Sequence, residues 1–413
     1  MRIAFLLDTF PKTSETFIVS QLVGLIERGH TVEIFSRYRN SDQPVHPDVR
    51  KYQLIDRTRY LIPASRKERA LVAAQSILRS GWRERLDLLR SISVQNGRAT
   101  FIREGLYGRG LLPNQATYDV IHCHFGPMGI FGQRLRDIGA LRGPLLTTFH
   151  GYDIASYVAA HGAAAYRDLF RKGDAITCSS SFIRGKLIAA GCDAAKIILF
   201  RLGTDLTKFD FLERVSDADG AIRLITVARL VEKKGLEYSI QAFAKLVKEF
   251  SKLEYAIVGD GPLRDQLSGL IRRLGLTTKV TLLGWKTQEE IRQLFRQSHI
   301  FVLASVTSAD GDFEGQGTVL QEAQAMGLPV VCTNHNGFPD SILDGQSGFL
   351  VPERDADALS AKLAELIRRP DSWAEIGGRG RAFVEAEFDL SKRNDALVEL
   401  YELLRTRCQP SRH

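Results

Sequence analysis

The chain has 413 residues, of which 44% are hydrophobic and 25% charged, and its formal net charge is +8. This length exceeds what one hydrophobic core usually serves, so it predicts two domains or a large two-lobed unit, and the composition fits a soluble globular protein. The first apolar run covers only residues 3–7. It is too short for a signal peptide or a membrane-spanning helix, and no other run approaches spanning length. We therefore expect a cytoplasmic protein.

Basic residues are concentrated in the first half of the chain. Residues 1–200 contain 28 Lys and Arg against 17 Asp and Glu, whereas the remainder contains 28 against 31. A basic half suits an acidic partner such as anionic lipid, a diphosphate-linked substrate or nucleic acid, although a simply solvated basic surface is an equal alternative. The five cysteines are scattered, odd in number and without a Cys-x-x-Cys pair, which favours reduced thiols.

The first half alternates strand and helix patterns. Apolar runs predict strands at residues 2–8, 31–37, 120–125, 144–150 and 175–180, with helices at 14–29 and 181–191 between them. This rhythm predicts a parallel sheet covered by helices on both faces. Residues 65–107 interrupt it with a basic amphipathic pattern, which fits either a helical pair on a membrane surface or ordinary core packing.

The second half restarts the same rhythm near Arg223. Strands are predicted at residues 223–230, 255–258, 280–285, 299–306, 329–334 and 348–352, and a helix at 287–298 opens on a capping box of Thr287 and Glu290. The polar stretch between Gly203 and Arg223 marks the boundary. We therefore expect an α/β protein of two Rossmann-like, doubly wound parallel-sheet domains, residues 1–205 and 206–387, facing a central cleft. In such sheets ligands lie at the carboxyl ends of the strands.

The segment 314–329, EGQGTVLQEAQAMGLP, carries the most information about function. Glu314 and Glu322 are eight residues apart, with a glycine-containing run before a predicted helix. Glycines let backbone N–H groups approach a ligand, and a helix N-terminus favours anions. The two acids can lie up to roughly 12 Å apart, which suits the two hydroxyl-rich ends of a nucleotide-sugar. The alternative is an ordinary helix with two exposed acids.

Two cations follow the first predicted strand of the second half. Arg229 and Lys234 lie within a turn that Gly235 closes. A guanidinium can bind two oxygens of a diphosphate, and a lysine adds a point charge that stabilises it as a leaving group. A solvated basic turn explains the same residues. Because these cations can replace a metal, we expect no metal requirement, although Asp310 and Asp312 form a DxD pair.

In this order the motifs resemble the retaining GT-B glycosyltransferases of the large family 4. The matching elements are Arg229 to Gly235, GDGP (259–262), LLGW (282–285), Glu314 with Glu322, Gly327-x-Pro329, DGxSGFLVP (344–352) and RLGTDLTKF (201–209). The first loop, FPKTSETF, resembles the subgroup that builds exopolysaccharides such as colanic acid. The resemblance implies that helices after about residue 388 return to the first domain.

The resemblance also implies roles for individual residues. Arg229 and Lys234 would hold the donor diphosphate, Glu322 the ribose, and Glu314 the donor sugar. The nucleobase would meet the backbone near Gly284. Backbone amides of the segment between the acids would contact sugar hydroxyls and phosphate, namely Gly315, Gln316, Gly317, Thr318 and Val319.

The first domain would supply His150 beside the donor sugar and an acceptor site. Ser14, Glu15, His124 and Asp153 are the acceptor candidates. Helix capping explains Ser14 equally well, and a helix-capping or core role is open for His150. His122 and His124 are two apart, but they lack a third ligand at useful spacing, so metal binding is weakly supported.

The sequence departs from the family at two places, of which the first concerns donor choice. Gly315 and Gln316 replace the usual Ser-Phe pair, and Asp340 replaces the common Glu. We expect an enzyme that transfers a hexose-type sugar from a UDP- or GDP-sugar, with retention and without a cofactor. The expected acceptor is a lipid-linked oligosaccharide at the inner membrane face, where the protein would be peripheral. The rivals are a synthase with a small soluble acceptor, a nucleotide-sugar epimerase, and a non-catalytic carbohydrate- or nucleic-acid-binding protein.

Overall fold

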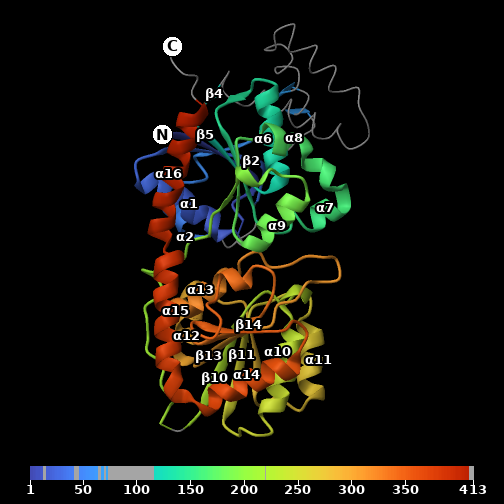
Figure 1. The fold of residues 1–413 in the computed structure, drawn as a ribbon, viewed down its shortest axis with the longest axis vertical. Coiled ribbons are helices and arrows are strands. Elements are labelled where there is room, and N and C mark those ends of the chain that lie inside the picture. The colour runs from blue at the N-terminus through green and yellow to red at the C-terminus, as the bar shows by residue number, and fades with distance from the viewer. Residues whose placement is uncertain are drawn as a thin grey trace. The chain divides into compact units, whose positions relative to one another are not determined.

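The computed structural model describes residues 1–12, 15–40, 46–63, 67–68, 71–72, 116–218 and 220–408. Two compact units are present. The first comprises Met1–Cys178, Arg184–Phe200 and Asn394–His413, and the second comprises Ser179–Ile183 and Arg201–Arg393. Each is built on one fully parallel sheet (Figure 1). The predicted amphipathic stretch at 65–107 lies almost wholly outside the described residues. Within the described part of the chain, no helix has the length and apolarity to cross a bilayer.

The sheet of the first unit has seven strands in the order β3-β2-β1-β5-β7-β8-β9. Their bounds are β1 Arg2–Phe10, β2 Thr31–Arg39, β3 Thr58–Tyr60, β5 Val120–His124, β7 Leu145–Phe149, β8 Ala175–Cys178 and β9 Ile197–Leu199. A two-stranded ladder pairs β4 (Ala116–Thr117) with β6 (Leu141–Arg142). The helices are α1 Thr16–Glu27, α2 Pro47–Lys51, α6 Gly126–Asp137, α7 Ser156–His161, α8 Arg167–Lys172 and α9 Ser181–Ala189.

Helices cover both faces of this sheet because alternate strand residues are apolar on each side. Phe5 belongs to a core with Leu22 of α1 and Tyr401 of α16 (Leu390–Cys408). On the other face α6 packs closely against the sheet, since a Cβ added to Gly132 would meet the sulfur of Cys123 at 2.6 Å. The predicted strands of this half are confirmed at these positions.

The second unit has six parallel strands in the order β12-β11-β10-β13-β14-β15. Their bounds are β10 Ile222–Val227, β11 Leu253–Val258, β12 Val280–Gly284, β13 Ile300–Leu303, β14 Val330–Thr333 and β15 Gly348–Val351. The helices are α10 Leu236–Leu246, α11 Arg264–Arg273, α12 Gln288–Gln297, α13 Thr318–Ala325, α14 Ala356–Arg368 and α15 Trp373–Glu387. In chain order the strands read 3-2-1-4-5-6, the doubly wound arrangement of dinucleotide-binding folds.

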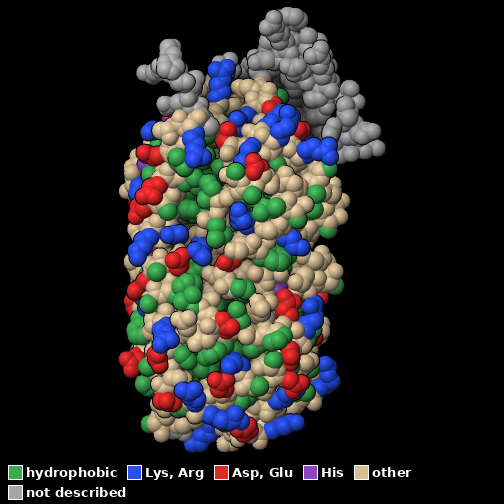
Figure 2. All heavy atoms as spheres, in the orientation of Figure 1, with side chains coloured by type: hydrophobic (Ala, Val, Ile, Leu, Met, Phe, Trp, Pro, Cys, Tyr) green, Lys and Arg blue, Asp and Glu red, His purple; other side chains and the backbone are tan. Residues whose placement is uncertain are grey.

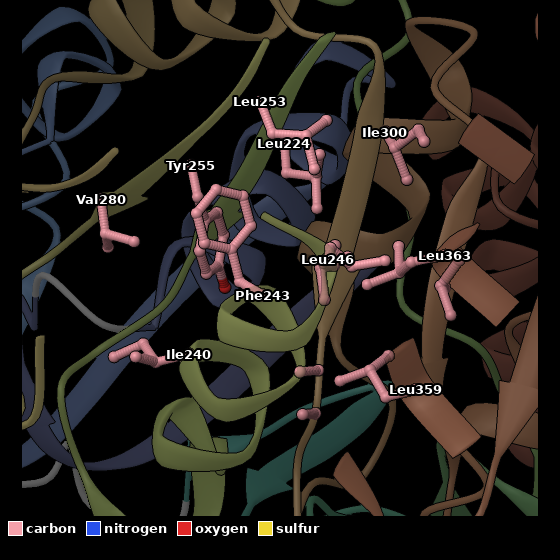
Figure 3. Close-up of a cluster of buried hydrophobic side chains, with 14 of the residues drawn as sticks. Leu224, Ile240, Phe243, Leu246, Leu253, Tyr255, Val280, Ile300, Leu359 and Leu363 are labelled. Carbon is pink, nitrogen blue, oxygen red and sulfur yellow. The ribbon is translucent and has the colours of Figure 1, made fainter. Parts of the chain in front are cut away.

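Two apolar layers sandwich this sheet. On one face Phe243 and Leu246 of α10 meet Leu363 of α14 over Tyr255 and Leu224 of the strands (Figure 3). On the other face the core is formed by residues of α12, α13 and α15, including Phe295, Leu320 and Val384. The predicted capping box of α12 is confirmed, because Thr287 and Glu290 each bond the other's backbone N–H.

Candidate functional site

The strand order of the second unit places a switch point between β10 and β13. The chain turns to β11 after β10 and to β14 after β13, so the loops after these two neighbours diverge at the carboxyl edge of the sheet. They touch at Gly235, whose φ of 57° is left-handed and whose added Cβ would lie 1.8 Å from the carbonyl oxygen of Ala304. A ligand crevice in such folds lies at this point.

A lysine–carboxylate cluster joins the two loops. Glu314 accepts from Lys234 at 3.0 Å and lies 3.4 Å from the Nζ of Lys233, which is also 2.9 Å from Asp312. Burial alone would raise the pKa of Glu314, but Lys234 and Lys233 lower that pKa to about 2. Glu314 is therefore ionised at neutral pH, although its side chain is only 12% exposed.

Arg229 follows the end of β10 and differs from Lys234 in its surroundings. It is exposed, and its guanidinium forms no ion pair or side-chain hydrogen bond with any residue that the structure describes. The buried Lys234 is held by Glu314. The site thus combines one cation free to meet an anion with one that is already oriented.

The start of α13 offers further donors to an anion. Gly317 is the N-cap with φ 73°, and no side chain caps the helix. Across the described chain, the backbone N–H groups of Gly315, Gln316, Gly317, Thr318 and Val319 have no hydrogen-bond acceptor. The side chain of Gln316 is not free for a ligand, since its amide bonds both the N–H and the carbonyl of Leu202.

Glu322 lies on α13, eight residues beyond Glu314. Its carboxylate is partly buried and has no hydrogen bond or ion pair with any described residue. Burial raises the pKa of Glu322 to about 7. An unpaired acid with a perturbed pKa at the edge of a switch point is typical of a binding site, because a bound ligand supplies the missing partner. Gly284, which ends β12, has a left-handed φ of 70°.

Both carboxylates of the DxD pair already interact with other groups of the protein. Asp310 accepts from the Ser308 hydroxyl at 2.5 Å and from the Asp312 N–H at 3.1 Å, while Asp312 is paired with Lys233. Among the residues described, no three His, Cys, Asp or Glu side chains gather as a metal ion would need.

Histidines gather in the first unit at the carboxyl ends of β5 and β7. The Nδ1 of His124 and the Nε2 of His150 are 3.0 Å apart, and their rings are stacked. Burial lowers the pKa of His150 to about 3 and that of His124 well below its usual value, so both are neutral. His122 bonds Tyr401 and Thr148 through its two ring nitrogens, which leaves neither for a metal.

Two acceptor candidates are less accessible than the sequence suggests. Asp153 is fully buried and accepts from the backbone N–H groups of Gly126, His150 and Gly151. It holds the turn that carries His150, so its carboxylate is not open to an acceptor. His124 is also fully buried and contacts His150 instead.

Glu15 immediately precedes α1 and remains an acceptor candidate. Its side chain is 14% exposed and lies 2.7 Å from the Nζ of Lys12, and burial raises its pKa. Ser14 lies outside the described residues. On the face drawn in Figure 2, Lys and Arg are interspersed with Asp and Glu, so the described residues form no continuous basic patch there.

Sequence reasoning missed three residues of the switch-point region. Lys233 stands beside Lys234 and pairs with Glu314. His335 accepts the Glu314 N–H, and Glu353 contacts His335. Lys233 could have been found in the sequence, because it is the neighbour of a predicted cation. His335 and Glu353 follow separate strands and come together because those strands are adjacent in the sheet.

Two doubly wound units, with a cation cluster and an open helix N-terminus at the switch point of one, are the arrangement expected of a glycosyltransferase of the GT-B type. Sequence profiles agree: residues 209–383 match "Glycosyl transferases group 1" and residues 13–203 match "Glycosyl transferase 4-like domain".

Relatives and solved structures complete the comparison. WcaL of Salmonella typhimurium, which carries the provisional name of a colanic acid biosynthesis glycosyltransferase, is 35% identical over 98% of this chain and 100% of its own. The amylovoran biosynthesis glycosyltransferase AmsK of Erwinia amylovora is 34% identical over the same shares. Anabaena HepE, solved in complex with UDP, shares the fold at 19% identity with a TM-score of 0.71 over 98% of this chain and 100% of its own. The chain belongs to the family of exopolysaccharide biosynthesis glycosyltransferases.

Proposed function

We propose that this enzyme transfers a sugar from a UDP- or GDP-sugar to a lipid-linked oligosaccharide, with retention of the anomeric configuration and without a metal. The observation that carries the proposal is the switch-point cluster, in which Lys234 is oriented by Glu314, while the side chains of Arg229 and Glu322 have no partner among the described residues. Two cations and an acid without a partner match a ligand with a diphosphate and a hydroxyl-bearing ring.

Each group has a task in the proposed donor site. Arg229 and Lys234 hold the diphosphate, and the free N–H groups from Gly315 to Val319 add uncharged donors to it and to the sugar. Glu322 accepts from the ribose hydroxyls. The base lies near the backbone of Gly284. Two structures of HepE, one in complex with UDP and one with UDP-glucose, support a nucleotide-sugar as the donor class.

The chemistry follows from charge. As the bond to the anomeric carbon breaks, negative charge develops on the leaving phosphate, and preorganised cations stabilise it most at that moment. In a retaining route the leaving phosphate takes the proton of the acceptor hydroxyl on the same face, so no side-chain nucleophile is required. Glu314 is ionised and held by lysines, which suits it to orient the sugar and the cations rather than to donate a proton.

The first unit would supply the acceptor site, in which Glu15, Ser14 and His150 are the candidate contacts. His150 is neutral and has one ring nitrogen engaged by His124. The relatives named for colanic acid and amylovoran biosynthesis support a polysaccharide intermediate as acceptor. Attachment of that intermediate to a membrane lipid, and a peripheral membrane position for the enzyme, belong to the same proposal.

Thermal-shift measurements against UDP-, GDP- and ADP-sugars test the donor first, because a ligand bound to the folded state raises its stability. Nuclear magnetic resonance of the transferred anomeric proton then reports the configuration. Sedimentation of the purified enzyme with anionic vesicles measures whether it binds a membrane surface. Binding is expected for a lipid-linked acceptor and not for a small soluble one. Stabilisation by no nucleotide-sugar, or an inverted product, would refute the proposal.

A further inference from the structure

Three neighbouring strands bring unrelated parts of the sequence to one place. Thr307 and Glu314 lie on the loop after β13, His335 follows β14, and Glu353 follows β15. These strands are adjacent in the sheet and parallel, so their carboxyl ends share one edge. His335 and Glu353 therefore lie beside the loop that follows β13.

A chain of hydrogen bonds connects these residues. The Nδ1 of His335 lies 2.5 Å from one oxygen of Glu353, and the Nε2 of His335 accepts the backbone N–H of Glu314 at 3.0 Å. The other oxygen of Glu353 accepts the Thr307 N–H at 3.1 Å. Glu353 thus reaches both ends of the segment 307–314, directly at Thr307 and through His335 at Glu314.

The hydrogen bonds define the tautomer of His335. A backbone N–H only donates, so Nε2 must carry a lone pair, and the ring proton must be on Nδ1, facing Glu353. His335 is completely buried. Burial lowers its pKa, outweighing the opposite effects of Glu353 and Glu314, while Lys234 lowers it further. The ring is therefore neutral, as the bond to Glu314 requires.

We propose that His335 and Glu353 are positioning residues of the donor site, which hold the Glu314 backbone so that its carboxylate orients Lys234. This inference rests on the proposed function of Glu314 and Lys234. Neither residue has to touch the donor. The effect is transmitted by one backbone hydrogen bond to a residue whose carboxylate lies 3.0 Å from a cation of the diphosphate site.

The chain offers a matched control at the opposite edge of the same sheet. His299 precedes β13, is 4% exposed, accepts the Arg223 N–H through Nδ1 at 3.0 Å and lies 3.4 Å from Asp217. It is likewise a buried histidine between a backbone N–H and a carboxylate. His299→Leu therefore removes similar interactions without affecting the carboxyl edge.

The experiment compares His335→Leu, His335→Gln and His299→Leu in the full chain, with two measurements. Hydrogen exchange of peptides that contain Glu314 requires no donor. It should accelerate at least about 10-fold in His335→Leu and remain unchanged in His299→Leu, because only the first removes the acceptor of that amide. Steady-state kinetics should show kcat reduced about 10- to 100-fold in His335→Leu, with donor KM changed less than about 3-fold. His335→Gln has both an acceptor oxygen and a donor group, and should restore kcat to within about 5-fold of wild type.

The outcomes separate the two hypotheses. If wild type transfers no sugar, the proposed function fails, and the exchange measurement still decides whether His335 holds Glu314. Unchanged exchange in His335→Leu, or equal loss of kcat in His299→Leu, would overturn the positioning role. So would a glutamine variant as inactive as the leucine variant although it is folded.

Discussion

Glu322→Gln is expected to stabilise the ligand-free protein above neutral pH while weakening donor binding. Burial raises the pKa of the Glu322 carboxyl from 4.5 to about 7, and no described residue compensates its charge. At pH 8 the folded wild type must therefore keep an unpaired, partly buried carboxylate, whereas glutamine has nearly the same size and no charge.

The magnitude follows from linkage between proton binding and folding. The raised pKa means that the folded state binds the proton more tightly than the unfolded state, so the stability of wild type rises as pH falls from 8 towards 5. For pKa values of 4.5 unfolded and about 7 folded, the gain between pH 8 and pH 5 is about 2.5 kcal/mol. Because the side chain is only partly buried, we expect a measured gain between about 1 and 2.5 kcal/mol.

Urea unfolding at pH 5 and pH 8 gives the change in unfolding free energy between the two pH values for each protein. The value for wild type minus the value for Glu322→Gln is the gain due to Glu322. Trp373 is fully buried in the second unit and provides a fluorescence signal for its unfolding. The contributions of other titrating groups to the unfolding free energy cancel when Glu322→Gln is compared with wild type. Glu254 is exposed on β11, so Glu254→Gln gives the baseline for replacing a carboxylate by an amide. A difference between variant and wild type that is the same at both pH values would refute the reasoning. A donor KM unchanged in Glu322→Gln would separately exclude its contact with the ribose.

Three further predictions concern charge and burial. Arg229→Ala and Lys234→Ala should each lose about 2–4 kcal/mol of transition-state stabilisation, measured from kcat/KM. Only Lys234→Ala should also lower the unfolding free energy, because it removes a partner of Glu314; equal unfolding curves for both variants would contradict this. Tyr401→Phe should destabilise the first unit by about 1–3 kcal/mol, measured by unfolding, since it leaves the buried Nδ1 of His122 without its 2.7 Å partner. Dialysis against EDTA should leave the transfer rate unchanged. A rate that is lost on dialysis and restored by Mn²⁺ would contradict this and would favour metal binding by the DxD pair.

The strands were predictable because their residues are apolar on both faces. The run at Ile222–Val227, for instance, contributes Leu224 to one core and Ile225 to the other. Short edge strands such as β3 and β9 were not predicted, since three residues carry too little periodicity to distinguish a strand from a loop. The parallel order of the sheets followed from the alternation of strands and helices.

The site was predictable where it is local in sequence and not where it depends on the sheet. Arg229 and Lys234 lie within one turn that Gly235 closes, and their spacing predicts an anion site beside the alternative of a solvated basic turn. Asp153 also lies close in sequence to His150, but its role depends on burial, which a motif does not report. His335 and Glu353 meet because β14 and β15 are adjacent, and no pattern within either segment indicates this.

The two acids of the segment 314–329 show most directly what sequence spacing leaves undetermined. Both are partly buried glutamates on one loop–helix element, yet the pKa of Glu314 is held at about 2 and that of Glu322 is raised to about 7. The difference arises from Lys233 and Lys234, which come from the loop after β10 and, of these two glutamates, pair only with Glu314. Environments that separate the pKa values of paired acids also separate their tasks. Glu314, already paired, is suited to orienting cations, whereas Glu322 gains more from a ligand because no residue that the structure describes bonds its carboxylate.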